Sequence, residues 1–214
     1  MELDVTANQR LGYLMGAPHG KLFVENRYTA WGNYYPHATL RNLWRLSEYI
    51  PTSKLQMELV NPCRYTEKYR ADDVLRPETY GTDYLFASVM VSNPLFWMEM
   101  QRLPEREAER LSSIVSVWKN YRDELVRADV RPLCEEPSGA SLTGFAATTE
   151  DALHLILLRE VTDRDTFTVE VGEGFGAPAL IASNAETEVM LERGTLTVRL
   201  SDPRAYAWIR LTKN

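Results

Sequence analysis

Hydrophobic positions follow two different patterns along the 214-residue chain. In the first part, short runs of consecutive apolar residues alternate with longer segments of helical period. The runs at 21–24 and 55–61 are typical of strands covered on both faces, and a shorter strand is expected near 3–6. This alternation of strands with helices favours parallel βα units.

Two longer segments have the apolar stripe of an amphipathic helix. Segment 37–50 is bounded by prolines, and Leu40 and Leu43 share one face of it. Segment 104–127 begins at a proline and continues with glutamates, which suits the positive end of a helix. We therefore predict a helix over each segment.

The region between these two helices is less regular. Residues 63–82 are polar and tyrosine-rich with several turn signals, so we expect an irregular segment there. Residues 83–100 are strongly apolar but are interrupted at Asn93-Pro94. Periodicity leaves two interpretations of this stretch: helix, turn and second helix, or a strand followed by a helix.

Beyond residue 141 the apolar period changes to two, which is typical of strands with one buried face. Short strands at this spacing imply an antiparallel sandwich, and residues 131–141 would link it to the first part. The predicted strands are 143–149, 152–160, 165–171, 178–183, 187–192, 195–200 and 205–211.

The parallel part looks too small to stand alone. It holds only about three βα units, whereas a parallel sheet needs both faces covered and its edges protected. A chain that opens in a strand therefore looks like a piece of something larger.

Composition and charge narrow the class of protein. A formal net charge of -6 without a basic stripe argues against nucleic acid as a partner. There is no run of about 18 apolar residues, so no membrane span is expected. The segment "MELDVTANQR" lacks the features of a secretory signal, which leaves the localisation open and favours the cytoplasm. Cys63 and Cys134 are far apart and have no metal-ligand spacing, so we expect two free thiols, no metal site and no cofactor.

Four segments carry a resemblance to a known family, and they occur in a matching order. They are "ENRYTAWGNYYPHATLRNLWRLSEYIP", "LQMELVNP", "EEPSGASLTGF" and "LHLILLREV". Together they resemble the C-terminal portion of α-galactosidase-like glycoside hydrolases of family 36 and clan D. The resemblance covers essentially the whole chain.

The resemblance implies an α/β region followed by an all-β region. Residues 1–130 would be the last strands and helices of a (β/α)8 barrel, and residues 131–214 a C-terminal antiparallel β-sandwich. The first strands of the barrel would be absent from the chain. Members of the family hydrolyse terminal α-galactosyl residues with retention, so the complete enzyme would hydrolyse O-glycosidic bonds of α-linked sugars.

Retention requires two carboxylates that flank the scissile bond. No segment matches the nucleophile motif of the family, so the resemblance implies that the nucleophile precedes Met1. The acid/base of the family follows an Arg-x-Asp pattern, whose nearest match, Arg10-Leu11-Gly12, ends in glycine. The catalytic residues stay unknown, with Asp4 and Glu25 as candidates. The resemblance also implies that Asp often stands where Ala30 is found, and this departure argues against full activity.

The candidate binding residues follow the strand at 21–24. In a barrel, functional groups gather at the carboxyl ends of the strands. Glu25, Asn26 and Arg27 offer a carboxylate, an amide and a guanidinium for sugar hydroxyls. Tyr28 and Trp31 offer an apolar wall for one sugar face. We predict that these five residues bind the substrate.

Structural interpretations of the same residues stay open. Glu25 and Arg27 could form a purely structural ion pair, and Asp4 could cap a turn. Trp31 could pack under a loop. Glu58, in an apolar strand, could face the barrel mouth or be paired structurally, because a buried carboxyl needs a partner.

Three functions are compatible with these patterns. The first is the C-terminal fragment of a glycoside hydrolase, inactive alone because the nucleophile strand is missing. The others are a non-catalytic carbohydrate-binding or assembly module and an inactive truncated gene product. The expected partner is a carbohydrate with a terminal α-linked sugar, whose identity the sequence leaves open. Exposed sheet edges could lead to self-association or to pairing with a missing N-terminal half.

Overall fold

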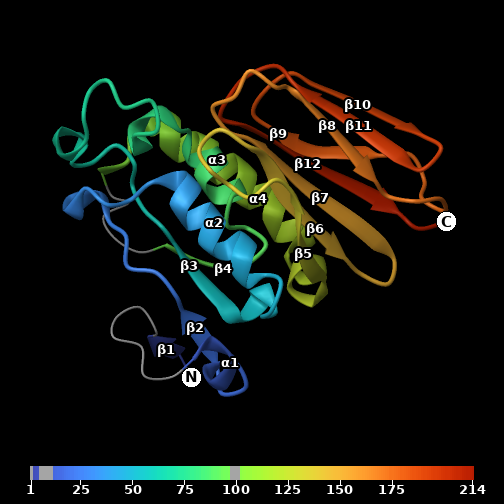
Figure 1. Ribbon diagram of the computed structural model, residues 1–214, viewed down its shortest axis with the longest axis horizontal. Coiled ribbons are helices and arrows are strands. Elements are labelled where there is room, and N and C mark those ends of the chain that lie inside the picture. Colours follow the sequence, from blue (N-terminus) through green and yellow to red (C-terminus); the bar gives the residue numbers. More distant parts are fainter. Residues whose placement is uncertain (1, 5–11, 97–101) are drawn as a thin grey trace.

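The computed structural model describes residues 2–4, 12–96 and 102–214. Within these ranges the chain forms a small parallel sheet, a layer of helices and two antiparallel sheets (Figure 1). The mixed α/β start and the antiparallel C-terminal sheets confirm the fold class at this level. The parallel sheet has four strands in the order β1-β2-β3-β4, namely β1 (Glu2–Asp4), β2 (Lys21–Phe23), β3 (Leu55–Leu59) and β4 (Asn93–Phe96).

Helices connect these strands and cover one face of the sheet. β1 pairs with β2, β2 with β3 and β3 with β4, and all three pairs are parallel. The helices are α1 (Tyr13–Gly16), α2 (Pro36–Leu46), α3 (Thr82–Ala87) and α4 (Glu105–Arg127). Short 3-10 turns complete the connections: η1 (Thr29–Trp31), η2 (Thr52–Lys54), η3 (Thr66–Lys68) and η4 (Pro77–Thr79).

The helix limits follow from local chemistry. Pro36 occupies the first turn of α2, where its missing N–H costs nothing. Glu105 and Glu107 lie in the first turn of α4 and Arg127 in its last, so each charge complements the helix dipole. The prediction for α2 was too long at its C-terminal end, because the chain turns after Leu46.

Two other local predictions were wrong. In segment 83–100, helix α3 is present as the helix-turn-helix interpretation expected, but strand β4 follows where that interpretation had a second helix, and the strand-then-helix order is reversed. Asn93 and Pro94 begin that strand instead of breaking a helix, and a strand edge tolerates the missing N–H of proline. The expected link at 131–141 begins inside a strand, β5 (Asp129–Cys134). β5 is an edge strand, which explains how it accommodates Pro132.

The C-terminal part contains two antiparallel sheets. The five-stranded sheet has the order β5-β6-β7-β12-β9 and the three-stranded sheet the order β10-β11-β8. The predicted strands of this region are all present. Their bounds are β6 (Leu142–Thr148), β7 (Ala152–Arg159), β8 (Thr166–Glu170), β9 (Ala179–Ser183), β10 (Thr187–Glu192), β11 (Thr195–Leu200) and β12 (Ala205–Thr212).

The five-stranded sheet is shared between two hydrophobic cores. One face packs on α3, α4 and the parallel sheet, and contributes Ile156 and Leu158 of β7 to that core. The other face packs on the three-stranded sheet and contributes Leu155 and Leu157. Every residue of β7 is therefore buried, while β8 alternates buried with exposed positions because its outer face meets water.

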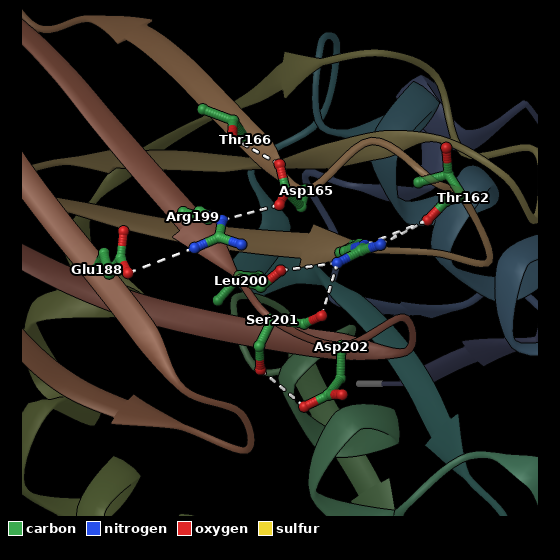
Figure 2. A network of polar contacts seen from close by, with 9 residues as sticks. Thr162, Asp165, Thr166, Glu188, Arg199, Leu200, Ser201 and Asp202 are labelled. Atoms are coloured by element: carbon green, nitrogen blue, oxygen red, sulfur yellow. Dashed lines mark hydrogen bonds and ion pairs between the residues drawn. The ribbon is translucent and has the colours of Figure 1, made fainter.

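Two buried side chains fasten the loops of this region. Glu160 Oε2 accepts backbone N–H groups of Ser138, Gly139 and Ser141 at 2.9, 2.7 and 2.9 Å. Arg159 donates to the carbonyl oxygens of Leu200, Ser201 and Thr162, which are labelled in Figure 2. These contacts hold the 138–141 loop and the end of β11 against β7.

Candidate functional site

The segment with the candidate residues leaves the carboxyl end of β2. It runs from Val24 to η1 and turns at Gly32, whose φ of 66° suits glycine. Residues 33–35 then lead into α2. This path brings the segment beside β3, whose carboxyl end is next in the same sheet.

Glu25 is buried against the start of α2. Its Oε1 accepts a hydrogen bond from the Thr39 hydroxyl at 3.1 Å and forms an ion pair with Arg27. Burial raises the pKa of Glu25, although the positive charge of Arg27 acts in the opposite direction. The ion pair between Glu25 and Arg27, expected as a structural interpretation, is therefore present. It holds the partly exposed guanidinium of Arg27 beside Glu25.

Tyr28 connects the segment to β3. Its hydroxyl lies 2.8 Å from Asn26 Oδ1 and 3.0 Å from Glu58 Oε1. A phenol has a single proton, so Tyr28 donates to one of these oxygens at a time. The structure thus brings Asn26 and Tyr28 together with Glu58, which lies 30 residues further along the chain.

Glu58 is a buried carboxyl with a strongly shifted pKa. The pKa of Glu58 is raised to about 7, chiefly by burial, with a smaller upward contribution from the negative charge of Glu25 and a downward one from the Tyr28 hydrogen bond. Tyr28, three residues after Glu25, joins the Glu58 carboxyl to the segment that follows β2. Glu58 can therefore exchange a proton near neutral pH.

Trp31 presents its indole to solvent. Its side chain is 64% exposed, and its ring meets that of Tyr28 edge to face, with centroids 4.8 Å apart and an interplanar angle of 89°. A tryptophan packed under a loop would be buried. An exposed aromatic face beside polar groups is instead suited to stacking on a ligand.

The other sequence candidates have different outcomes. Asp4 ends β1, and the structure describes its backbone but not its side chain. Arg10 and Leu11 lie outside the described residues, and Gly12 precedes α1. Ala30 lies in η1, between Thr29 and Trp31, and therefore within the candidate site.

Two polar residues of the site were not predicted. Thr39 hydrogen-bonds Glu25 from α2, and Gln56 is buried on β3 two positions before Glu58. The run "LQMEL" contained the signal for Gln56, because a period of two places it on the face of Glu58. Nothing in the spacing indicated Thr39.

The described residues contain no evident metal site. Within 2–4, 12–96 and 102–214, no group of three or more His, Cys, Asp or Glu side chains could hold a metal ion. Cys63 and Cys134 are free thiols, and none of the helices is long and apolar enough to cross a membrane within the same ranges.

No protein-family model and no curated protein matches the sequence. Solved structures do match in fold. The galactosidase domain of an α-galactosidase–sucrose kinase superposes with a TM-score of 0.59 and 9% identity, over 91% of this chain and 26% of that chain. An α-galactosidase from Geobacillus stearothermophilus gives a TM-score of 0.59 and 11% identity, again over 91% and 26%. An Anoxybacillus α-amylase gives 0.57 and 16%, over 91% of this chain and 47% of its own.

These likenesses confirm the coarser part of the fold expectation, a mixed α/β region followed by antiparallel sheets. The chain spans about a quarter of the length of the α-galactosidase chains, which is consistent with a C-terminal piece. The fold shared with these chains is the mixed α/β and antiparallel architecture described above.

Proposed function

We propose that the chain is the C-terminal part of an α-galactosidase-like glycoside hydrolase and that residues 25–31 bind the terminal sugar of an α-linked carbohydrate. The observation that carries the proposal is the polar and aromatic cluster at the carboxyl ends of β2 and β3. In barrel enzymes the substrate meets the protein at this end of the strands. The fold likeness to α-galactosidases over most of the chain supports the same interpretation.

The chemistry of the cluster suits a sugar. A sugar offers several hydroxyl groups and a flat apolar face. The carboxylate of Glu25, the amide of Asn26 and the guanidinium of Arg27 are directional partners for hydroxyls. The exposed indole of Trp31 suits the apolar face.

The parallel strands would then be the closing arc of a (β/α)8 barrel. Within the described residues, β1 and β4 are the edges of the parallel sheet, and each carries unpaired backbone groups. We expect these edges to pair with further barrel strands, supplied by an N-terminal half. A second copy of the chain could cover the same edges in its place.

Catalysis by the 214 residues alone is not expected. A retaining hydrolase needs a nucleophile and an acid/base. Glu25 is engaged by Arg27 and Thr39, which suits binding better than attack on a sugar. Glycine at position 12 and alanine at position 30 supply no proton-transferring group.

Sugar binding and turnover can be measured separately. Isothermal titration with methyl α-galactoside and methyl α-glucoside tests binding, and an aryl α-galactoside tests turnover. We expect saturable binding of one methyl glycoside and no turnover. Absence of binding to both would contradict the proposal, whereas addition of a co-expressed N-terminal half should restore turnover if the hydrolase assignment is right.

A non-catalytic carbohydrate-binding module is the second candidate. The position of Ala30 favours it, because this residue lies in η1 beside the Tyr28–Trp31 ring pair and offers no carboxylate. This candidate predicts the same sugar binding and no turnover even with an N-terminal half present.

A further inference from the structure

Three buried acceptor oxygens belong to β3 and to the segment that follows β2. Glu25 Oε2, Gln56 Oε1 and Glu58 Oε2 accept no hydrogen bond from any residue that the structure describes. The three residues are 6%, 7% and 4% exposed. A buried polar atom without a partner is costly, so three in one site indicate a ligand that supplies donors.

Strand geometry places the oxygens of Gln56 and Glu58 on the face opposite the helices. Leu55, Met57 and Leu59 of β3 lie in the hydrophobic core beneath the helices. Successive side chains of a strand point to opposite faces, so Gln56 and Glu58 point away from that core.

The register of the sheet relates Glu25 to Glu58. Phe23, the last residue of β2, pairs with Gln56 of β3. Glu25 follows Phe23 by two residues, as Glu58 follows Gln56, and Tyr28 connects the segment after β2 to Glu58 through its hydroxyl. The effect of the Glu25 charge on the pKa of Glu58 agrees with this proximity.

Each carboxyl has one oxygen engaged by the protein and one oxygen left over. Oε1 of Glu25 is held by Thr39 and Arg27, and Oε1 of Glu58 by Tyr28. These contacts hold both groups through Oε1 and leave the two Oε2 atoms available as acceptors. Gln56 adds a neutral acceptor beside them.

The ligand that fits is neutral and rich in hydroxyls. A sugar supplies several O–H donors at once, and each can satisfy one acceptor without adding charge. A cation fits less well, because Arg27 already places a positive charge on Glu25 and no third ligating carboxylate, His or Cys joins the pair among the described residues.

We propose that Gln56 and Glu58, together with Glu25, form a hydroxyl-binding subsite beside the face of β3 that lies opposite the helices. This inference rests on the proposed sugar-binding function and names residues that deepen it. Glu58 is a binding residue in this proposal, and its carboxylate accepts a hydroxyl of the sugar.

The test compares Glu58→Gln with a control from the same strand. Affinities for methyl α-galactoside and methyl α-glucoside are measured by isothermal titration on the full 214-residue chain. Glu58→Gln should weaken binding about 10-fold to 100-fold, the usual effect of losing a hydrogen bond to a charged acceptor. Met57→Leu, on the opposite face, should bind like the wild type. Gln56→Leu provides a second variant, with an expected loss of about 10-fold.

The pH dependence separates binding from a merely structural role. Because burial raises the pKa of Glu58 to about 7, the wild type should bind the sugar more tightly above neutral pH than below it. Glu58→Gln should weaken this dependence, and what remains comes from Glu25, whose pKa burial also raises.

The outcomes distinguish the proposed subsite from the proposed sugar-binding function on which it rests. If the wild type binds a sugar and both Glu58→Gln and Gln56→Leu bind equally well, the subsite is wrong while the sugar-binding proposal stands. If the wild type binds neither glycoside, both are overturned. Calcium binding that depends on Glu58, measured with calcium chloride alone and without sugar binding, would also overturn the subsite.

Discussion

His154 Nδ1 accepts a hydrogen bond from the indole N–H of Trp208 at 3.1 Å, in the interior of the protein. The other ring nitrogen, Nε2, lies 2.7 Å from Glu124 Oε2, and Arg210 reaches the same carboxylate oxygen at 3.0 Å. Since Nδ1 accepts, Nε2 carries the proton and donates to Glu124. The network connects α4 with β7 and β12, so it joins the helical layer to the five-stranded sheet.

The pH dependence of stability should reveal this histidine. Burial lowers the pKa of His154, although Glu124 opposes the shift and Arg210 adds to it. Below about pH 6.5 the unfolded state therefore binds a proton that the native state does not, and stability falls as the pH falls. Replacing His154 by Gln should cost about 1–3 kcal/mol at pH 7.5 and less at pH 5. Urea unfolding at both pH values measures this difference, and an equal cost at both would contradict the assignment.

Glu58 should give a pH dependence of opposite sign. Its native pKa of about 7 lies above the ordinary value of 4.5, so between these values the native state holds the extra proton. The contribution of this group to stability therefore falls as the pH rises through that window. Relative to the wild type, Glu58→Gln should gain stability between about pH 5 and pH 8. Met57→Leu carries no titratable change and should show a constant difference in urea unfolding.

Arg159 and Arg199 provide a matched pair of substitutions, and Figure 2 labels Arg199 with its partners Asp165 and Glu188. Arg159 is buried and donates to three backbone carbonyls, whereas Arg199 is half-exposed and pairs with Asp165 and Glu188. Arg159→Met leaves buried carbonyls without donors and should cost about 3 kcal/mol. Arg199→Met should cost less than about 1 kcal/mol, because exposed ion pairs contribute little. Denaturant unfolding compares the two, and equal costs would contradict this prediction.

Gly139 should tolerate a side chain less well than Gly172. Its φ is 95°, and a Cβ at this position would lie 2.7 Å from Leu75 Cδ1. Gly172 has a φ of 79° and no neighbour within 4 Å of such a Cβ, so it reports backbone strain alone. We expect Gly172→Ala to cost about 1 kcal/mol and Gly139→Ala at least about 1 kcal/mol more. Thermal unfolding of both variants measures the difference, and a smaller loss at Gly139 would show that the loop moves freely.

Trp31 should matter for binding and not for stability. Its side chain is 64% exposed, so Trp31→Ala should change the free energy of unfolding by less than about 1 kcal/mol. If the indole stacks on the sugar, the affinity for the bound methyl glycoside should fall at least about tenfold. Tyr49 is 70% exposed and lines a different part of the surface, so Tyr49→Ala is the control. Equal affinities of the two variants would remove Trp31 from the site.

The sequence predicted elements well where one local rule dominated. Helix α4 followed from its apolar stripe and its flanking charges, and the C-terminal strands followed from a period of two. It failed at 93–96 and at 129–134, where proline suggested an interruption. An edge strand tolerates proline, and only sheet order reveals which strands are edges.

The candidate site divides in the same way. The sequence by itself determined that Glu25, Asn26, Arg27, Tyr28 and Trp31 follow a buried strand, because these residues are neighbours in the chain. Only the tertiary structure decided that Glu58 and Gln56 join them and that Thr39 holds Glu25. The reason is physical: parallel pairing of β2 with β3 brings together residues about 30 positions apart, and burial, which sets the pKa of Glu58, is a property of the packed sheet and not of the local sequence.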